Sequence, residues 1–273
     1  MSPELDGESA TVKTQDLFVE APQGKLFVRV WGGLSRVAET TIVMLHDSLG
    51  CVELWRDFPA MLSGATGLPV VAYDRLGFGK SDPHPGRLGF DFIRDEPGGG
   101  LAEIVGKLGL QRVIPFGHSV GGGMAVATGA ALPEICSVVI TESAQVFVED
   151  RTTAGVKDAK AAFQAPGRID RLARYHGDKA RWVLDAWTET WLAPEFAAWS
   201  LDEDLHALRC PVLAMHGDRD EYGSLAFPER ITRLASSASA EMMIFEDCGH
   251  APHRERPEAV LQAVTAFLAK VGV

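Results

Sequence analysis

Residues 115–124 read PFGHSVGGGM and place Ser119 between two glycines, directly after an apolar run. The run RVIPFGH predicts a buried strand, and the segment GGGMAVATGAAL that follows predicts a helix. With 28 glycines in 273 residues, the pattern G-x-S-x-G also arises by chance, so the pattern alone decides nothing. A strand, a sharp turn and a helix around one serine favour an exposed, reactive hydroxyl over an ordinary turn residue.

Strand-like and helix-like segments alternate on both sides of this turn. Strands are expected at 16–21, 25–32, 40–46, 69–75, 112–119, 136–143, 211–220 and 240–250, the first two forming a hairpin. Helices are expected at 52–67, 90–110, 121–132, 225–237 and 256–271, with a break in the second at Pro97 and the glycines after it. This alternation predicts an α/β fold, with a mostly parallel sheet of about eight strands and helices on both faces.

One stretch departs from the alternation. Residues 145–203 contain helical patterns without a convincing strand, and they hold four of the six tryptophans: Trp182, Trp187, Trp191 and Trp199. We interpret this stretch as a helical cap inserted into the sheet domain. The expected organisation is therefore a first core part at 1–144, the cap at 145–203 and a second core part at 204–273.

Composition limits the class of protein. The chain is 46% hydrophobic and carries a formal net charge of −11, which disfavours binding to nucleic acid. The start, MSPELDGESATVKTQD, does not resemble a secretory leader, and no apolar run is long enough to cross a membrane. Four scattered cysteines predict neither disulfides nor zinc. We expect a cytoplasmic protein with a small-molecule substrate, and a homodimer is compatible with the cap.

Polar residues with complementary chemistry follow three of the predicted strands. Ser119 follows one strand, Asp218 and Asp220 follow another in MHGDRD, and His250 follows the last in DCGH. The carboxyl ends of parallel strands meet at one edge of a sheet, where open α/β sheets place their sites. A serine hydroxyl needs a base, and that base needs an acid to orient it. The order Ser, Asp, His supplies all three.

These motifs make the chain resemble the α/β-hydrolases over nearly its whole length. The family pattern G-x-x-D falls on Gly217 to Asp220, and G-H-x-P-x-x-E-x-P-E falls on residues 249–258. The loop YDRLGFGKSD at 73–82 also resembles the family's segment at that place. The resemblance implies Ser119 as nucleophile, His250 as base and Asp220 as acid. Asp218 and Glu142 remain alternatives for the acid.

The resemblance also implies two backbone donors for an oxyanion. One is the amide of Val120, directly after the nucleophile, and the other is the amide of Ser48 in the loop MLHDSLG. This loop departs from the family pattern because Asp47 stands where glycine is usual. A carboxylate pointing toward an oxyanion would repel it, whereas a carboxylate turned into the loop could bond the backbone.

The expected activity is hydrolysis of a small, largely apolar carboxylic ester through an acyl-enzyme, without cofactor or metal. Alternatives on the same triad are hydrolysis of a carbon–carbon bond in ring-cleavage products and a cofactor-free haloperoxidase-like reaction. A ligand-binding protein with little turnover is the alternative from another class. His46 and His118 are interpreted as bracing the backbone. His250 and His253 have a metal-like spacing, but no third ligand is near in sequence.

Overall fold

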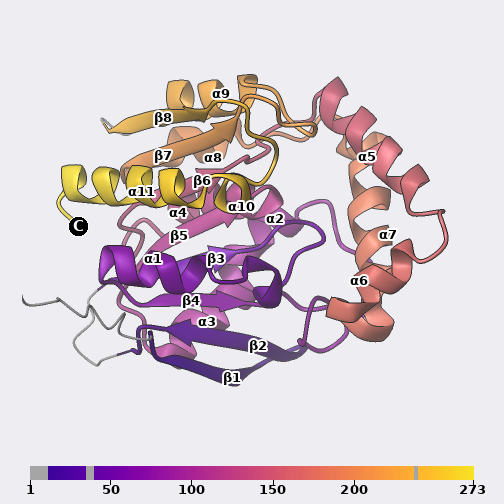
Figure 1. The fold of residues 1–273 in the computed structure, drawn as a ribbon, viewed down its shortest axis with the longest axis horizontal. Coiled ribbons are helices and arrows are strands. Elements are labelled where there is room, and N and C mark those ends of the chain that lie inside the picture. Colours follow the sequence, from indigo (N-terminus) through magenta and orange to yellow (C-terminus); the bar gives the residue numbers. More distant parts are fainter. Residues whose placement is uncertain (1–11, 35–39, 237–238) are drawn as a thin grey trace, which may run out of the picture.

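A computed structural model describes residues 12–34, 40–236 and 239–273 (Figure 1). The first eleven residues of the polar start lie outside the described residues. An eight-stranded sheet runs through the molecule in the order β1-β2-β4-β3-β5-β6-β7-β8. Its strands are β1 (Thr14–Ala21), β2 (Gly24–Trp31), β3 (Thr40–Leu45), β4 (Val70–Tyr73), β5 (Arg112–His118), β6 (Val139–Glu142), β7 (Val212–Gly217) and β8 (Ala240–Phe245).

The sheet is mostly parallel, as the alternation predicts. β2 pairs antiparallel with β1 and with β4, and the five pairings from β4 through β3, β5, β6 and β7 to β8 are parallel. The expected hairpin is confirmed, with Ala21 opposite Gly24 at its turn. The fold class of the sequence analysis is therefore correct, and every predicted strand is present.

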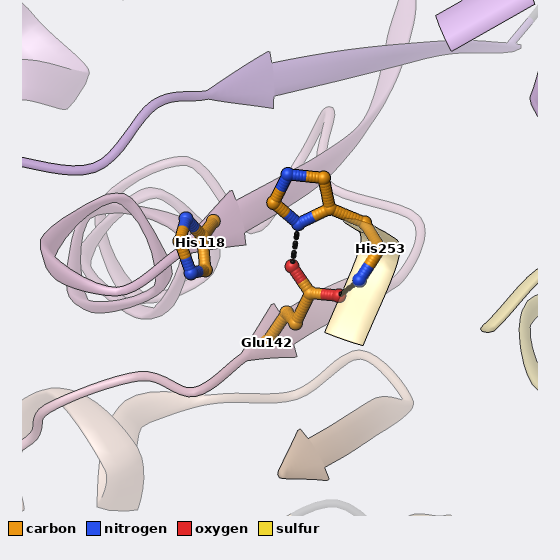
Figure 2. A group of neighbouring side chains, drawn as sticks. All are labelled: His118, Glu142 and His253. Atoms are coloured by element: carbon orange, nitrogen blue, oxygen red, sulfur yellow. Dashed lines mark hydrogen bonds and ion pairs between the residues drawn. The ribbon is translucent and has the colours of Figure 1, made fainter. Parts of the chain in front are cut away.

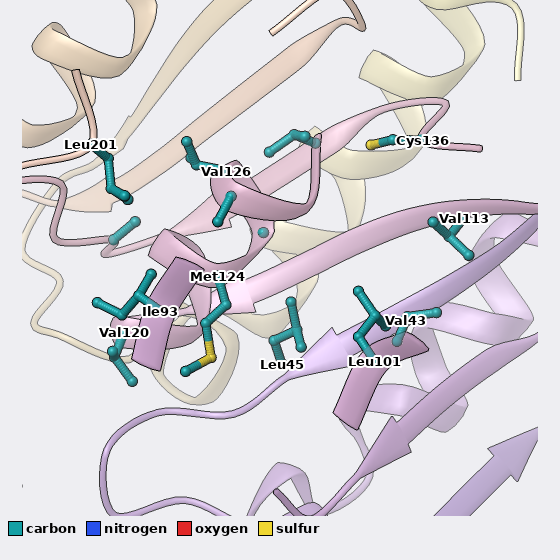
Figure 3. Packing of buried hydrophobic residues seen from close by; sticks show 14 of the residues in the cluster. Val43, Leu45, Ile93, Leu101, Val113, Val120, Met124, Val126, Cys136 and Leu201 are labelled. Atoms are coloured by element: carbon teal, nitrogen blue, oxygen red, sulfur yellow. The ribbon is translucent and has the colours of Figure 1, made fainter. Parts of the chain in front are cut away.

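Helices cover both faces because side chains alternate along the buried strands. Ile42 and Met44 of β3 face α1 (Phe58–Thr66) and α11 (Pro257–Val271), whereas Val43 and Leu45 face the opposite layer. That layer holds α2 (Phe92–Asp95), α3 (Gly100–Leu108), α4 (Val120–Ala131), α8 (Asp202–Ala207) and α9 (Ala226–Leu234). Figure 3 shows Val120 and Met124 of α4 packed among its side chains.

Two predicted helices are interrupted. The segment 52–67 begins as a 3-10 turn at Val52–Trp55 and continues as α1, which ends at Gly67 in the left-handed conformation. The segment 90–110 divides into α2 and α3 around Pro97, as expected, because proline and the glycines after it do not continue a helix. Among the described residues, no helix combines the length and apolar character needed to span a bilayer.

Between β6 and β7 the chain leaves the sheet. It forms α5 (Asp150–Ala162), α6 (Arg168–His176) and α7 (Ala180–Trp191) before α8 returns it to the core. Figure 1 shows α5, α6 and α7 gathered at one end of the sheet. A bridge between Phe147 and Ser200 closes the base of this excursion. We keep the interpretation of this region as a cap, because α5 and α7 border the cavity described below.

Candidate active site

The turn between β5 and α4 holds Ser119 in a strained conformation, with φ 57° and ψ −124°. The strand and helix meet so closely here that only glycine fits on either side. A Cβ on Gly117 would lie 1.9 Å from the Gly121 oxygen, and a Cβ on Gly121 would lie 2.1 Å from the Leu45 oxygen. These two glycines therefore allow the sharp turn that presents the Ser119 side chain at the carboxyl edge of the sheet.

His250 and Asp220 form a close pair beside this turn. The Nδ1 atom of His250 lies 2.9 and 2.8 Å from the two carboxylate oxygens of Asp220. Asp220 is itself held from behind, because its Oδ1 accepts the backbone N–H groups of Tyr222 at 2.7 Å and Gly223 at 3.1 Å. Asp218 bonds elsewhere, accepting the backbone N–H of Cys248 at 3.3 Å. The geometry thus selects Asp220 over Asp218 as the partner of His250.

The two members of this pair shift each other's pKa. Burial alone would lower the pKa of His250, but the hydrogen bond and the charge of Asp220 outweigh it, so this pKa lies above its ordinary value. Burial would likewise raise the pKa of Asp220, but the hydrogen bond and charge of His250 hold it below the ordinary value. Asp220 is therefore ionised at neutral pH and favours the proton on Nδ1 of His250, which leaves Nε2 as the basic atom.

The Ser119 hydroxyl donates a hydrogen bond to Oε1 of Gln145 at 3.2 Å. In the described part of the chain, no hydrogen bond joins this hydroxyl to His250. Both side chains nevertheless line one small cavity of about 80 Å³. The sequence analysis missed Gln145, although its place just after a strand at the carboxyl edge was a signal that could have found it.

The cavity lies between the sheet and the helices inserted after β6. Trp187 and Trp191 of α7 and Val156 of α5 form its apolar side. The rest of the lining is formed by Asp47, Ser48, Leu49, Ser119, Gln145, Thr152, Tyr222 and His250. Two of the four tryptophans in the inserted region therefore face the cavity. The other two pack elsewhere, since Trp182 bonds Gly86 and Trp199 stacks on Phe196.

Of the two expected amide donors, Ser48 in the loop after β3 lines this cavity, and Val120 at the start of α4 is not among the lining residues. Within the described residues, neither the Ser48 nor the Val120 amide donates to a protein acceptor, so both are free to bind an oxyanion. Asp47 folds back over its own turn, because a Cβ on Gly50 would lie 1.8 Å from its Oδ1. Arg75 holds the loop by donating to the main-chain oxygen of Asp47 at 2.9 Å. Asp47 nevertheless borders the cavity.

Comparison with known proteins decides the family. The model of the alpha/beta hydrolase family matches residues 42–263, which is most of the chain. The chain belongs to this family. This α/β-hydrolase is 25% identical to a 2-hydroxy-6-oxononadienedioate/2-hydroxy-6-oxononatrienedioate hydrolase of Pseudomonas putida, over 92% of this chain and 95% of that protein. A hydrolase of the same name from Paraburkholderia xenovorans is 28% identical over 84% of this chain and 86% of its own length.

Other relatives have different names. A non-heme haloperoxidase of Rhodococcus erythropolis is 26% identical over 85% of this chain and 92% of its own length. Among solved structures, the 2-hydroxy-6-oxo-6-phenylhexa-2,4-dienoate hydrolase of a Rhodococcus species covers 95% of this chain and 100% of its own, with a TM-score of 0.77 and 19% identity. That structural likeness supports the fold of this α/β-hydrolase and leaves its substrate open.

A second carboxylate–histidine pair of the hydrolase lies behind the first. Glu142, at the end of β6, accepts both the backbone N–H and the Nδ1–H of His253, each at 2.6 Å (Figure 2). His118 lies between the two pairs, with its ring centroid 5.0 Å from that of His250 and 4.9 Å from that of His253. Glu142 is therefore engaged by His253, and it is not the acid that partners His250.

His118, Glu142 and His253 also form the group most like a metal site in the described chain, with ligand atoms within 4.8 Å of one another. The sequence analysis found no third ligand near His250 and His253, and the fold supplies His118 and Glu142 from two other strand ends. The hydrogen bonding does not fit a metal. Each Glu142 oxygen already accepts an N–H, and His118 uses Nε2–H to bond the main-chain oxygen of His250 at 2.8 Å. His118 braces the backbone, as expected.

Proposed function

We propose that this α/β-hydrolase cleaves its substrate by nucleophilic attack of Ser119 on a carbonyl carbon. The observation that carries the proposal is the meeting of Ser119 and the His250–Asp220 pair around one cavity. The Ser119 hydroxyl would turn from Gln145 toward Nε2 of His250, which takes its proton as the oxygen attacks. The amides of Ser48 and Val120 would bind the resulting oxyanion, and water would then release the acyl group.

The bond cleaved is the finer question, and the relatives favour the alternative over the ester. Hydrolases of 2-hydroxy-6-oxononadienedioate cover most of this chain. We therefore propose a carbon–carbon bond next to a ketone as the first candidate. Attack on the ketone carbon would expel the neighbouring carbon, which takes a proton from His250. Water would then hydrolyse the acyl-enzyme and release a carboxylic acid. Atoms balance as addition of one water across the bond.

An ester is the second candidate, and one observation favours it. Among the described residues that line the cavity there is no lysine or arginine to bind the carboxylate of a dienoate. A neutral ester needs no such partner, and the apolar surface of Trp187 and Trp191 suits a short acyl or aromatic group.

Parallel assays distinguish the two bonds. We would follow the loss of conjugated absorbance from 2-hydroxy-6-oxo-6-phenylhexa-2,4-dienoate, and the release of 4-nitrophenol from 4-nitrophenyl butyrate, with wild type and Ser119→Ala. We expect the variant to lose at least about 10³-fold of whichever activity is present. Turnover of the dienoate supports the first candidate, and turnover of the ester alone supports the second. A wild type that cleaves neither and does not react with a fluorophosphonate would leave only a binding role.

A further inference from the structure

Asp47 brings a carboxylate to the cavity beside Ser119. It is the only carboxylate in the cavity lining, and the other described lining residues are neutral or apolar apart from His250. The apolar share comes from Leu49, Val156 and the rings of Trp187 and Trp191. A substrate at Ser119 would therefore meet aromatic rings and a carboxylate, a combination that attracts positive charge and repels negative charge.

The loop keeps Asp47 at this place. Its Oδ1 packs against Gly50, where any side chain would collide with the carboxylate. Behind the loop, Arg75 bonds the main-chain oxygen of Asp47, and its guanidinium lies over the ring of Phe78 at 4.4 Å. Arg75 is not part of the cavity lining, although its charge interacts with that of Asp47. The sequence HDSLG thus places an acidic residue at the border of the cavity, with one carboxylate oxygen folded against Gly50.

Neighbouring charges do not reverse the negative electrostatic potential that Asp47 gives the cavity. Asp220 and the exposed Glu221 add negative charge on the His250 side. Arg151 donates to the main-chain oxygen of Asp220 at 3.2 Å and borders an outer hollow, not this cavity. The field of Asp47 also reaches across the cavity, since it contributes to raising the pKa of Tyr222 and of His250.

We propose that Asp47 is a specificity-determining residue that makes the cavity reject negatively charged acyl groups and accept positively charged ones. The acyl group would lie between Asp47 and the Trp187 and Trp191 rings while its carbonyl carbon faces Ser119. This inference rests on the proposed role of Ser119 as nucleophile. It sets this hydrolase apart from relatives named for dicarboxylate substrates.

Matched 4-nitrophenyl esters test this charge preference (the charge rule) without assuming which bond is cleaved in the natural substrate. The first pair is the anionic monoester of glutarate and its neutral isostere, the glutaramate ester. The second is the cationic 4-(trimethylammonio)butanoate ester and its neutral isostere, the 5,5-dimethylhexanoate ester. We expect kcat/KM for the anion to be at least tenfold below that of its isostere, and kcat/KM for the cation to be at or above that of its isostere.

Asp47→Asn is the decisive variant, because it keeps the size of the side chain and removes its charge. The anionic-to-neutral ratio of kcat/KM should rise at least fivefold, whatever happens to the absolute rates. Asp178→Asn removes a carboxylate from an exposed position outside the cavity lining and should leave the ratio unchanged. An unchanged ratio in Asp47→Asn, or equal rates for anion and isostere in wild type, would overturn the inference.

Failure of the proposed function gives a different result. Fluorophosphonates with anionic and cationic tails label Ser119 without any need for deacylation, so their labelling rates report the same charge ratio when ester turnover is slow. A serine that reacts without charge preference contradicts only the role of Asp47. A serine that reacts with neither probe contradicts the nucleophile itself and the charge rule with it.

Discussion

The molecule contains two carboxylate–histidine pairs of similar geometry and different surroundings. Asp220 and His250 lie 2.8 Å apart, and Glu142 and His253 lie 2.6 Å apart. Glu142 ends β6, Asp220 and His250 lie in the loops after β7 and β8, and His253 lies in the short helix α10 (Pro252–Glu255). The side chain of His250 is 14% exposed and borders the cavity beside Ser119. The side chain of His253 is 1% exposed, packs against Trp55 and Phe58, and leaves its Nε2 without a partner.

This difference shows that a carboxylate–histidine pair is not by itself a catalytic device. A base must reach the substrate with a free nitrogen, and only His250 meets the cavity. The bonds between Glu142 and His253 connect the end of β6 to α10, the helix that follows the loop carrying His250, and His118 bonds the His250 main chain. We interpret Glu142–His253, the buried pair, as a structural support for Asp220–His250, the more exposed pair.

The largest effect should come from removing the acid of the exposed pair. Asp220→Asn should lower kcat/KM about 10⁴-fold at neutral pH, because an amide neither stabilises the imidazolium nor holds the correct tautomer. Steady-state kinetics on the better substrate of the two assays measures the loss. Asp218→Asn, two residues away, should stay within about threefold of wild type, since the proposed mechanism does not use its carboxylate. Equal losses in both variants would contradict the assignment of Asp220.

Removing the acid of the buried pair should affect stability more than rate. Glu142→Gln should lower the free energy of unfolding by about 3 kcal/mol, because one partner of a buried, hydrogen-bonded pair is replaced. Urea denaturation measures this change, with Glu134→Gln as the control at an exposed position. The rate per folded molecule should stay within about tenfold. A loss as large as that of Asp220→Asn would make Glu142 a catalytic acid and remove the distinction between the pairs.

His118 should transmit a smaller effect between the two pairs. His118→Leu removes the donor to the His250 main chain, and kcat should fall about tenfold with KM nearly unchanged, because the base is displaced and the cavity is not. His118→Gln keeps an N–H group and should recover most of the rate. Circular dichroism confirms that both variants are folded. If glutamine is no better than leucine, the hydrogen bond does not position His250.

The pH profile should show the smallest effect and report only the exposed pair. In the proposed mechanism His250 acts as a base when neutral, so kcat/KM should fall as pH drops through its pKa, which is raised above that of an ordinary histidine. In Asp220→Asn the acid limb of the residual activity should shift to lower pH, because the charge that stabilised the imidazolium of His250 is gone. Burial lowers the pKa of His118 to about 4, which keeps this histidine neutral over the range of the assay. If the acid limb does not shift in Asp220→Asn, Asp220 does not raise the pKa of His250.

Most of the fold follows from local patterns. Short apolar runs such as 40–46 and 69–75 predict strands buried on both faces, and the structure confirms them as β3 and β4. Pro97 and its glycines predict the break between α2 and α3 for the same local reason. Element ends were less accurate, as in 240–250, where the strand stops at Phe245 and a loop carries His250. Hydrogen bonds with distant residues set such ends, and a local pattern does not contain them.

The sequence by itself determined the α/β class, the glycines around Ser119 and the order of serine, aspartate and histidine, because backbone strain and strand periodicity are local properties. Only the tertiary structure decided which carboxylate meets which histidine. Asp218, Asp220 and Glu142 were all compatible with the spacing, and the packing of three strand ends assigned Asp220 to His250 and Glu142 to His253. The positions of Gln145 beside Ser119 and of Asp47 at the cavity wall were likewise decided by the tertiary structure. Contacts between residues far apart in the chain depend on how the strands pack, and no local spacing encodes them.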